Sequence, residues 1–247
     1  MVRRHEGTAF MAGAFVFPGG SVDATDRALA PGDLEDAPFR VAAARELFEE
    51  AGVLLARRGD TGAFASLGDD DVKRRLIQYR GQVHDGREPF STVLERERLQ
   101  LALDLLVPFA HWVTPPVDTR RFDTRFFITR VPPDQAAAHD NTETIDSAWM
   151  TATQALDRCR RGDIVLPPPT WTTLREIEPF GSVDAALAWA RRRTIQRREP
   201  KFVVENGVKM LLLPGDPQNP EASVGPPPVD TRFILTNGRW RAEAART

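Results

Sequence analysis

The stretch that decides the fold is Arg45-Glu46-Leu47-Phe48-Glu49-Glu50-Ala51-Gly52-Val53. Glu46, Glu49 and Glu50 are three and four residues apart, so a helix places their carboxylates on one face. Like charges at that spacing repel each other, and a purely structural helix gains nothing from them. A divalent cation removes this repulsion, because Mg²⁺ and Mn²⁺ prefer oxygen ligands from carboxylates, water and phosphates. The acidic face therefore predicts a Mg²⁺ or Mn²⁺ site for phosphate chemistry, with a simply solvated helix face as the alternative.

The residues before this stretch indicate a strand, a glycine turn and then a helix. Ala14-Phe15-Val16 is apolar, and the following Phe17-Pro18-Gly19-Gly20 predicts a turn where the backbone approaches a ligand or metal closely. Gly52 occupies the position at which helices commonly end. Opposite the acidic face, apolar residues recur at helical spacing, namely Val41, Ala44, Leu47, Phe48 and Ala51.

Together these residues resemble the Nudix box, the signature of hydrolases that cut a diphosphate linking a nucleoside to another group. The family pattern is a Gly, five residues, an acid, seven residues, and then Arg-Glu-apolar-x-Glu-Glu-x-Gly-apolar. Residues 45–53 match the second half at every specified position. In the first half Gly20 is followed six positions later by Asp26, but eighteen residues, 27–44, then precede Arg45, an insertion of eleven. Residues 30–33 and 36–38 have loop composition, so the insertion is expected to bulge from the loop before the helix.

A longer match places the resemblance in one branch of the family. The chain is similar to Nudix proteins of the peroxisomal coenzyme A diphosphatase type, which also carry an enlarged loop inside the box. The resemblance covers roughly residues 3–178. The segments that carry it outside the box are His111–Pro115, Arg120–Phe127, Glu143, Trp149 and Leu166–Thr170.

The resemblance implies an α/β fold, the Nudix α/β/α sandwich, with a mixed β-sheet between helices and the Glu-bearing helix against one face. We expect a Nudix domain at residues 1–178, with a helical insertion at about 60–106. Residues 179–247 are expected to form a C-terminal extension that packs on the core or on a second copy of the chain in a homodimer. Nudix domains normally have a full strand before the one that leads to the glycine turn. Met1–Arg4 supplies only its last residues, so the first strand is expected to be truncated.

Periodicity and turn residues predict further elements outside the box. The expected helices are 69–83, 89–106, 153–161 and 182–198, and the expected strands are 122–129, 145–150, 201–213 and 232–240. The last strand contains an Asn237-Gly238 turn. The helix at 182–198 ends in several arginines, which we interpret as complementing the helix dipole.

The resemblance also implies catalytic and metal-binding roles. The implied metal ligands are Glu46, Glu49, Glu50 and the carbonyl of Gly20. Arg45 is expected to orient one of the carboxylates through charge-assisted hydrogen bonds. The general base stays open between Glu46 and Glu143, because Nudix enzymes differ on this point.

Substrate contacts are expected from two arginines and the glycine turn. Arg125 is the preferred phosphate contact and Arg121 the second, because the forked donors of a guanidinium bind two phosphate oxygens at once. The alternative is a solvated face on which these arginines pair with Asp118 and Asp123. Gly19 is expected to contribute its backbone to substrate binding.

Composition limits the classes of function. The chain has 247 residues and a hydrophobic content of 41%, enough for a substantial core. A net charge of -2 and a pI near 6.1 argue against a dedicated nucleic-acid binder. No apolar run approaches the about 20 residues of a membrane helix, so no membrane partner is expected. The single cysteine, Cys159, indicates a reducing, cytoplasmic compartment, and the C-terminal Ala245-Arg246-Thr247 is no Ser-Lys-Leu peroxisomal address.

The implied activity is metal-assisted hydrolysis of the P–O–P linkage in a small nucleoside diphosphate derivative. The branch resemblance favours coenzyme A or acyl-CoA as substrate. ADP-ribose, NADH and other nucleotides remain alternatives within the same chemistry. A non-catalytic Nudix ligand sensor is the alternative of a different class, and the complete acidic cluster favours an enzyme over it.

Overall fold

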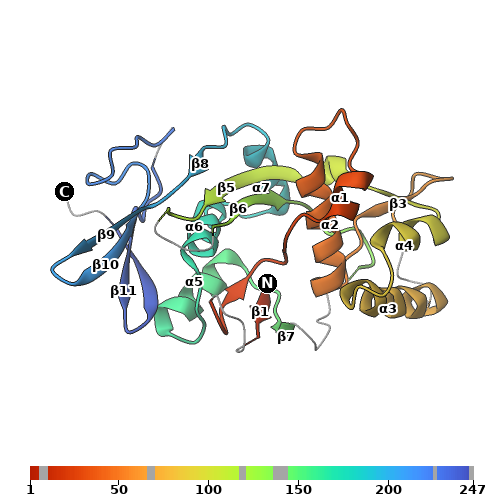
Figure 1. The fold of residues 1–247 in the computed structure, drawn as a ribbon, viewed down its shortest axis with the longest axis horizontal. Coiled ribbons are helices and arrows are strands. Elements are labelled where there is room, and N and C mark those ends of the chain that lie inside the picture. The colour runs from red at the N-terminus through yellow and green to blue at the C-terminus, as the bar shows by residue number, and fades with distance from the viewer. Residues whose placement is uncertain (6–10, 66–69, 117–120, 136–143, 225–226, 245–247) are drawn as a thin grey trace. The chain divides into compact units, whose positions relative to one another are not determined.

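A computed structural model describes residues 1–5, 11–65, 70–116, 121–135, 144–224 and 227–244 (Figure 1). The chain forms two compact units. The first comprises residues 1–13, 17–106 and 129–149, and the second comprises residues 14–16, 107–128 and 150–247. The division expected at residue 178 stays a prediction.

The first unit contains most of the helices that surround the acidic stretch. Its elements are β1 (Val2–Arg4), α1 (Ala24–Leu29), α2 (Ala37–Ala51), β3 (Ala56–Arg58), α3 (Asp70–His84), α4 (Phe90–Arg96), β4 (Leu99–Leu101), the 3-10 helix η1 (Leu103–Leu105) and β7 (Thr144–Ser147). β1 pairs with β7 and β3 pairs with β4, both antiparallel. The sheet pairings thus join residues that are far apart in the sequence.

Helix α2 carries the acidic residues, and the local sequence explains both of its ends. Its first turn contains Pro38, whose fixed φ suits this position and whose missing N–H needs no partner there. Gly52 ends the helix with a φ of 68°, and its N–H donates to the carbonyls of Leu47 and Phe48. The expected loop at residues 36–38 was therefore wrong in part, because Ala37 and Pro38 already belong to the helix.

The core of the first unit lies where α2 packs against α3 and α4, which lie beside it in Figure 1. Phe48 of α2 is 2% exposed and stacks on Phe90 of α4, with ring centroids 5.6 Å apart. Leu76 and Val83 reach the same cluster from α3. Each fully buried side chain of this size stabilises the fold by about 1.5–3 kcal/mol. Apolar burial therefore anchors the helical insertion, which contains α3 and α4, to the acidic helix α2.

The single helix expected at residues 89–106 was wrong. α4 ends at Arg96, and Arg98 takes a left-handed backbone conformation, with φ 53°, that turns the chain into β4. β4 then pairs with β3, with Leu101 opposite Ala56. The spacing of the apolar residues in this segment also fits a helix. Pairing with β3 buries the same apolar residues and gives their backbone groups hydrogen-bond partners, so the strand forms in place of the helix.

The described residues of the second unit form two sheets, three helices and the short strand β2, which pairs with β1. Its elements are β2 (Phe15–Val16), β5 (Val107–Val113), β6 (Asp123–Ile128), α5 (Ala152–Arg161), α6 (Pro168–Ile177), α7 (Val183–Ala190), β8 (Arg197–Arg198), β9 (Lys201–Glu205), β10 (Val208–Leu212), β11 (Arg232–Thr236) and β12 (Arg239–Glu243). One sheet has the order β6-β5-β8 and is mixed, because β5 is antiparallel to β6 and parallel to β8.

The other sheet is antiparallel in the order β12-β11-β10-β9 and forms the blue lobe of Figure 1. The predicted Asn237-Gly238 turn joins β11 to β12, and an equivalent Asn206-Gly207 turn joins β9 to β10. All four turn residues have positive φ, the backbone that tight hairpins require. The strand expected at residues 201–213 is therefore a hairpin of two strands.

The helix expected at residues 182–198 was too long. α7 ends at Ala190, and Arg197 and Arg198 form β8 beside β5. The guanidinium of Arg198 lies over the ring of Trp112, 5.6 Å from its centroid. For these two arginines the helix-dipole interpretation was wrong, because an ion pair and an aromatic ring hold Arg198 in the sheet.

Glu176 of α6 supplies a pH-dependent contribution to the stability of this unit. It accepts hydrogen bonds from Arg198 and from both terminal nitrogens of Arg193, the latter at 3.1 and 3.2 Å. Burial alone would raise the pKa of Glu176, but the hydrogen bonds and charges of the two arginines outweigh it and lower the pKa. The ionised form is thus stabilised in the folded state, and this stability is lost as the pH falls through the lowered pKa.

We therefore predict that Glu176→Gln lowers the free energy of unfolding by about 1–3 kcal/mol at pH 7. The difference from the wild type should start to shrink as the pH falls through the ordinary glutamate range and approach zero below the lowered pKa of Glu176, where the wild-type carboxyl is protonated as well. Urea unfolding of the wild type and the variant at pH 7 and pH 3 measures this difference in the free energy of unfolding. Glu205→Gln, at an exposed position, is the control. An equal loss at both pH values would contradict the prediction.

Candidate functional site

Arg45 lies at the centre of a buried cluster in the first unit. Its Nε and Nη2 donate to the two carboxylate oxygens of Asp26, each at 2.9 Å. Asp26 is 0% exposed and Arg45 is 8% exposed. Nη2 also donates to the carbonyl of Ser21 at 2.9 Å. This two-point pairing is the strong geometry for a guanidinium and a carboxylate, so Arg45 is held in one orientation.

The remaining donor of Arg45 contacts two of the expected metal ligands. Nη1 donates to Oε1 of Glu46 at 2.9 Å and to Oε1 of Glu49 at 2.8 Å. Burial alone would lower the pKa of Arg45, but its hydrogen bonds to Asp26 and Glu49 and the nearby carboxylates raise it. Arg45 therefore remains a cation and fixes the side chains of Glu46 and Glu49 relative to Asp26.

The glycine turn contacts the same helix face. The N–H of Gly19 donates to Oε2 of Glu50 at 2.9 Å. A Cβ atom placed on Gly20 would lie 2.2 Å from Oε1 of Glu46, far inside the contact distance. Only glycine therefore lets the turn approach the acidic face this closely.

This approach leads to a prediction for Gly20→Ala. The added methyl group must displace the Glu46 carboxylate, so metal-dependent turnover should fall by about 10- to 100-fold. The melting temperature should change little, because the clash is with the end of a flexible side chain. Gly32→Ala is the matched control, since a Cβ atom there meets nothing within 4 Å. Steady-state kinetics measures the loss of turnover in each variant, and thermal unfolding measures its stability. Full activity of Gly20→Ala would contradict the placement of the glycine turn at the metal site.

Asp26 and the short helix α1 are parts of the cluster to which the sequence analysis gave no role. Asp23 caps α1 by accepting the N–H of Asp26 at 2.8 Å, and the Asp26 carboxylate accepts the N–H of Asp23 at 3.0 Å. This reciprocal capping box orients α1 so that Asp26 faces Arg45. The sequence signal for Asp26 was its position six residues after Gly20, which matches the family pattern. The insertion after Asp26 lengthens its spacing to Arg45 and so obscured this signal.

Helix α3 covers the other side of Glu49. Nε of Arg80 donates to the backbone carbonyl of Glu49 at 2.7 Å, and Nδ1 of His84 lies 3.9 Å from Oε2 of Glu49. Sequence reasoning missed both residues. Arg80 falls on the buried stripe of α3 with Leu76 and Val83, and a charged residue in an apolar stripe was the signal that could have indicated a specific partner.

The charge distribution of the cluster favours an added cation. Burial raises the pKa of Glu46, and the charges of Glu49 and Asp26 raise it further, against the opposing effect of Arg45. Among the residues that the structure describes, no group of three or more His, Cys, Asp or Glu side chains is arranged as a metal site. Arg45 donates to Glu46 and Glu49, and the Gly19 N–H donates to Glu50.

The donor set nevertheless fits a hard divalent cation. Glu46, Glu49 and Glu50 offer carboxylate oxygens on the helix face that the Gly19-Gly20 backbone approaches closely. Mg²⁺ and Mn²⁺ take such ligands and complete their coordination with water and phosphate oxygens. That these three glutamates and the carbonyl of Gly20 hold the ion stays a prediction.

The two arginines expected to bind phosphate lie in the second unit. Arg125 of β6 is opposite His111 of β5 and pairs with Asp123. Burial, followed by the charge of Arg125, lowers the pKa of His111, while Asp123 opposes the shift. Arg121 pairs with Glu199 at 2.7 Å and borders a hollow of about 280 Å³. The substrate contacts of Arg121 and Arg125 stay predictions, and Glu143 lies outside the described residues.

Comparison with known proteins now decides the family. The family model of the NUDT19 Nudix domain matches residues 30–177, which include α2 and its three glutamates. The chain belongs to the Nudix hydrolase family. A solved Nudix hydrolase from Alicyclobacillus acidocaldarius has the same fold, with a TM-score of 0.66 and 26% identity over 76% of this chain and 86% of that chain. The expected α/β Nudix fold is thereby confirmed.

The relatives also confirm the branch. A Xenopus laevis protein named acyl-coenzyme A diphosphatase NUDT19 is 26% identical over 90% of this chain and 71% of the relative. A human protein of the same name is 26% identical over 87% of this chain and 70% of the relative. The Nudix chain is thus a pyrophosphohydrolase of the NUDT19 branch, in a family whose members generally use divalent metals. No helix in the described parts of the chain is long and apolar enough to span a membrane.

Proposed function

We propose that this Nudix protein is a Mg²⁺- or Mn²⁺-dependent diphosphatase that acts on coenzyme A and acyl-CoA. The observation that carries the proposal is the buried Arg45 cluster, in which one guanidinium joins Asp26 to Glu46 and Glu49. The names of the NUDT19 relatives support coenzyme A derivatives as the substrate class. ADP-ribose and NADH remain the competing substrates in the test.

The acidic face would bind the metal through Glu46, Glu49, Glu50 and the Gly20 carbonyl. When bound there, a divalent ion neutralises diphosphate oxygens and lowers the pKa of a coordinated water. Arg45 keeps the carboxylates in position, because its own position is fixed by a buried aspartate. In this proposal Arg45 is a positioning residue, since its described contacts are with the Ser21 carbonyl and with carboxylates of α1 and α2.

Hydrolysis then requires a water oxygen to attack one phosphorus of the diphosphate. The new P–O bond replaces the bond to the bridging oxygen, which leaves with the second phosphate. From coenzyme A the products are 3′,5′-ADP and a phosphopantetheine. A carboxylate takes the proton of the water, and both Glu46 and Glu143 fit this role by residue type. Arg121, Arg125 and the backbone at Gly19 are proposed to contact the substrate phosphates.

The domain and location assignments also belong to the proposal. Residues 1–178 are proposed as the Nudix domain and 179–247 as an extension that contacts the core or a second copy. Cys159 is free and partly buried, and burial raises the pKa of its thiol, which suits an unreactive cysteine in a reducing, cytoplasmic compartment. Sedimentation of the purified chain at two concentrations measures whether two copies associate.

A substrate screen by mass spectrometry tests the proposal. Purified protein is incubated with CoA, acetyl-CoA, octanoyl-CoA, ADP-ribose and NADH, each with Mg²⁺, with Mn²⁺ and with EDTA. We expect phosphopantetheine or its acyl form as a metal-dependent product, with kcat/KM for a CoA species above that for the other substrates. Higher kcat/KM for ADP-ribose or NADH would reject the proposed substrate class, and binding without turnover would reject an enzyme.

A further inference from the structure

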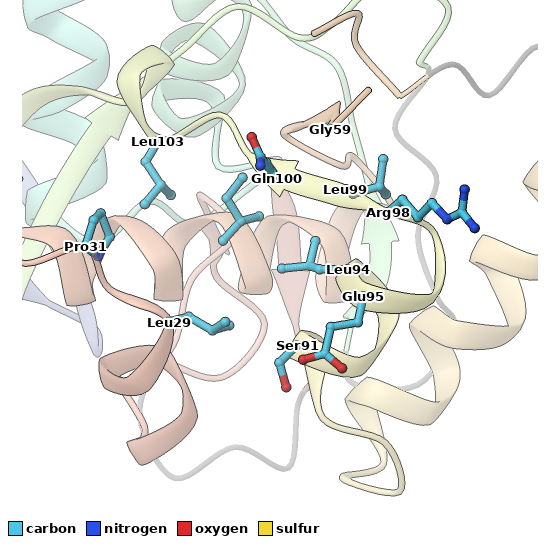
Figure 2. A pocket seen from close by; sticks show the side chains of 11 residues that line it. Leu29, Pro31, Gly59, Ser91, Leu94, Glu95, Arg98, Leu99, Gln100 and Leu103 are labelled. Atoms are coloured by element: carbon cyan, nitrogen blue, oxygen red, sulfur yellow. The ribbon is translucent and has the colours of Figure 1, made fainter. Parts of the chain in front are cut away.

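A pocket of about 530 Å³ opens in the first unit between α1, α4 and β4 (Figure 2). This volume lies within the range of roughly 300–1,000 Å³ that is typical of small-molecule sites. Most of the lining side chains are aliphatic. They are Leu29, Pro31, Leu94, Leu99, Leu101 and Leu103.

The remaining lining identifies the chemistry of the ligand. The charged side chains among the described residues at the pocket are exposed Glu95 and Arg98, one of each sign. A polyanion such as a nucleotide needs an excess of positive charge, which this lining does not offer. None of those described lining residues is aromatic, so a nucleobase would find no ring on which to stack. The lining suits an uncharged aliphatic group.

The walls of the pocket connect to the hydrophobic core. Leu94 is 6% exposed and belongs to the core cluster, while Leu29, Leu99 and Leu101 pack against that cluster and stay partly exposed. A bound aliphatic chain would remove the exposed parts of these leucines from water, which is favourable in proportion to the apolar area. Leu29 is also the last residue of α1, and Asp26 one turn earlier holds Arg45.

We propose that this pocket binds a linear aliphatic acyl chain. The inference rests on the proposed function, because acyl-CoA substrates carry such a chain. A free fatty acid that binds separately from the substrate would carry the same kind of aliphatic chain. Both sources present consecutive methylene groups to the leucines, and the experiment distinguishes them.

The experiment measures binding by calorimetry in EDTA, so that turnover does not occur. The ligands are CoA, octanoyl-CoA and decanoate below its critical micelle concentration. Ser91→Phe fills the pocket from the first turn of α4, at a half-buried position. Ser91→Ala is the matched control, because it leaves the volume open. Circular dichroism and thermal unfolding verify that both variants fold.

Two results support the acyl-chain site. If the chain comes from the substrate, wild type and Ser91→Ala bind octanoyl-CoA at least about tenfold tighter than CoA, since each buried methylene adds about fourfold. This ratio then falls to near one in Ser91→Phe. If the chain comes from a fatty acid, decanoate binds to wild type and Ser91→Ala and its binding is lost in Ser91→Phe.

The inference is overturned if octanoyl-CoA and CoA bind the wild type equally and decanoate does not bind. It is also overturned if a preference exists but survives in Ser91→Phe. Failure of the proposed function is a separate result, namely no cleavage of any CoA species with Mg²⁺ or Mn²⁺. The binding data decide on the pocket in that case too, because they do not depend on turnover.

Discussion

Glu49→Gln and Glu50→Gln should each lower metal-dependent turnover by about 10²- to 10³-fold. Each substitution removes one charged oxygen ligand of the expected cation, and such an ion contributes several kcal/mol to transition-state stabilisation. The amide is nearly isosteric, and its carbonyl oxygen still accepts the hydrogen bond from Arg45 or from the Gly19 N–H. We therefore expect both variants to fold and to lose activity through the metal. The measurements are kcat with Mg²⁺ and Mn²⁺, Mn²⁺ affinity by calorimetry, and thermal unfolding.

Glu205→Gln controls for the change from carboxylate to amide, because Glu205 is an exposed residue of β9 in the second unit. Its turnover and Mn²⁺ affinity should equal those of the wild type. Wild-type turnover in Glu49→Gln or Glu50→Gln would remove that residue from the site. Reduced turnover with unchanged Mn²⁺ affinity would assign the residue a role other than metal binding.

Arg45→Met should produce the largest loss of stability. The substitution removes the cation from a fully buried carboxylate, and breaking a buried pair from one side costs about 3–5 kcal/mol. The carboxyl group of Asp26 would lose its buried partner, while Glu46 and Glu49 would lose their shared donor. We expect the free energy of unfolding to fall by this amount and turnover to fall with it. Urea unfolding monitored by circular dichroism measures the first effect.

The double variant Asp26→Asn with Arg45→Met separates stability from activity. Because it removes both charges, it should regain part of the lost free energy of unfolding relative to Arg45→Met alone. Turnover should remain low, since Glu46 and Glu49 still lack the guanidinium that positions them. If the double variant regains turnover, or if Arg45→Met is as stable as the wild type, the central role of the cluster is wrong.

The acidic face could be predicted because its information is local. Helical spacing alone puts Glu46, Glu49 and Glu50 on one face, and Gly52 marks the end of the helix through its left-handed backbone. Turn chemistry was equally local, as Asn237-Gly238 shows, because that dipeptide tolerates the positive φ values that a hairpin requires. In each case neighbouring residues supply both the pattern and its physical cause.

Where segments depended on distant partners, the predictions were less accurate. Residues 99–101 follow a helical stripe in the sequence, yet they pair with β3 more than forty residues earlier. Arg197 and Arg198 continue a predicted helix, yet they form a strand beside β5. Such outcomes depend on which pairing buries more surface and satisfies more backbone groups, and a window of neighbouring residues does not contain that information.

The amino-acid sequence by itself determined the family, the acidic helix and the class of chemistry, because these follow from residue types at short fixed spacings. Only the tertiary structure decided that Asp26, nineteen positions before Arg45, is its buried partner. It also decided that Arg80 of α3 caps the backbone of Glu49, and that aliphatic residues of α1, α4 and β4 line one pocket. The physical reason is that packing brings together buried charges and apolar side chains from segments that are distant in the sequence, and local spacing does not determine which segments pack together.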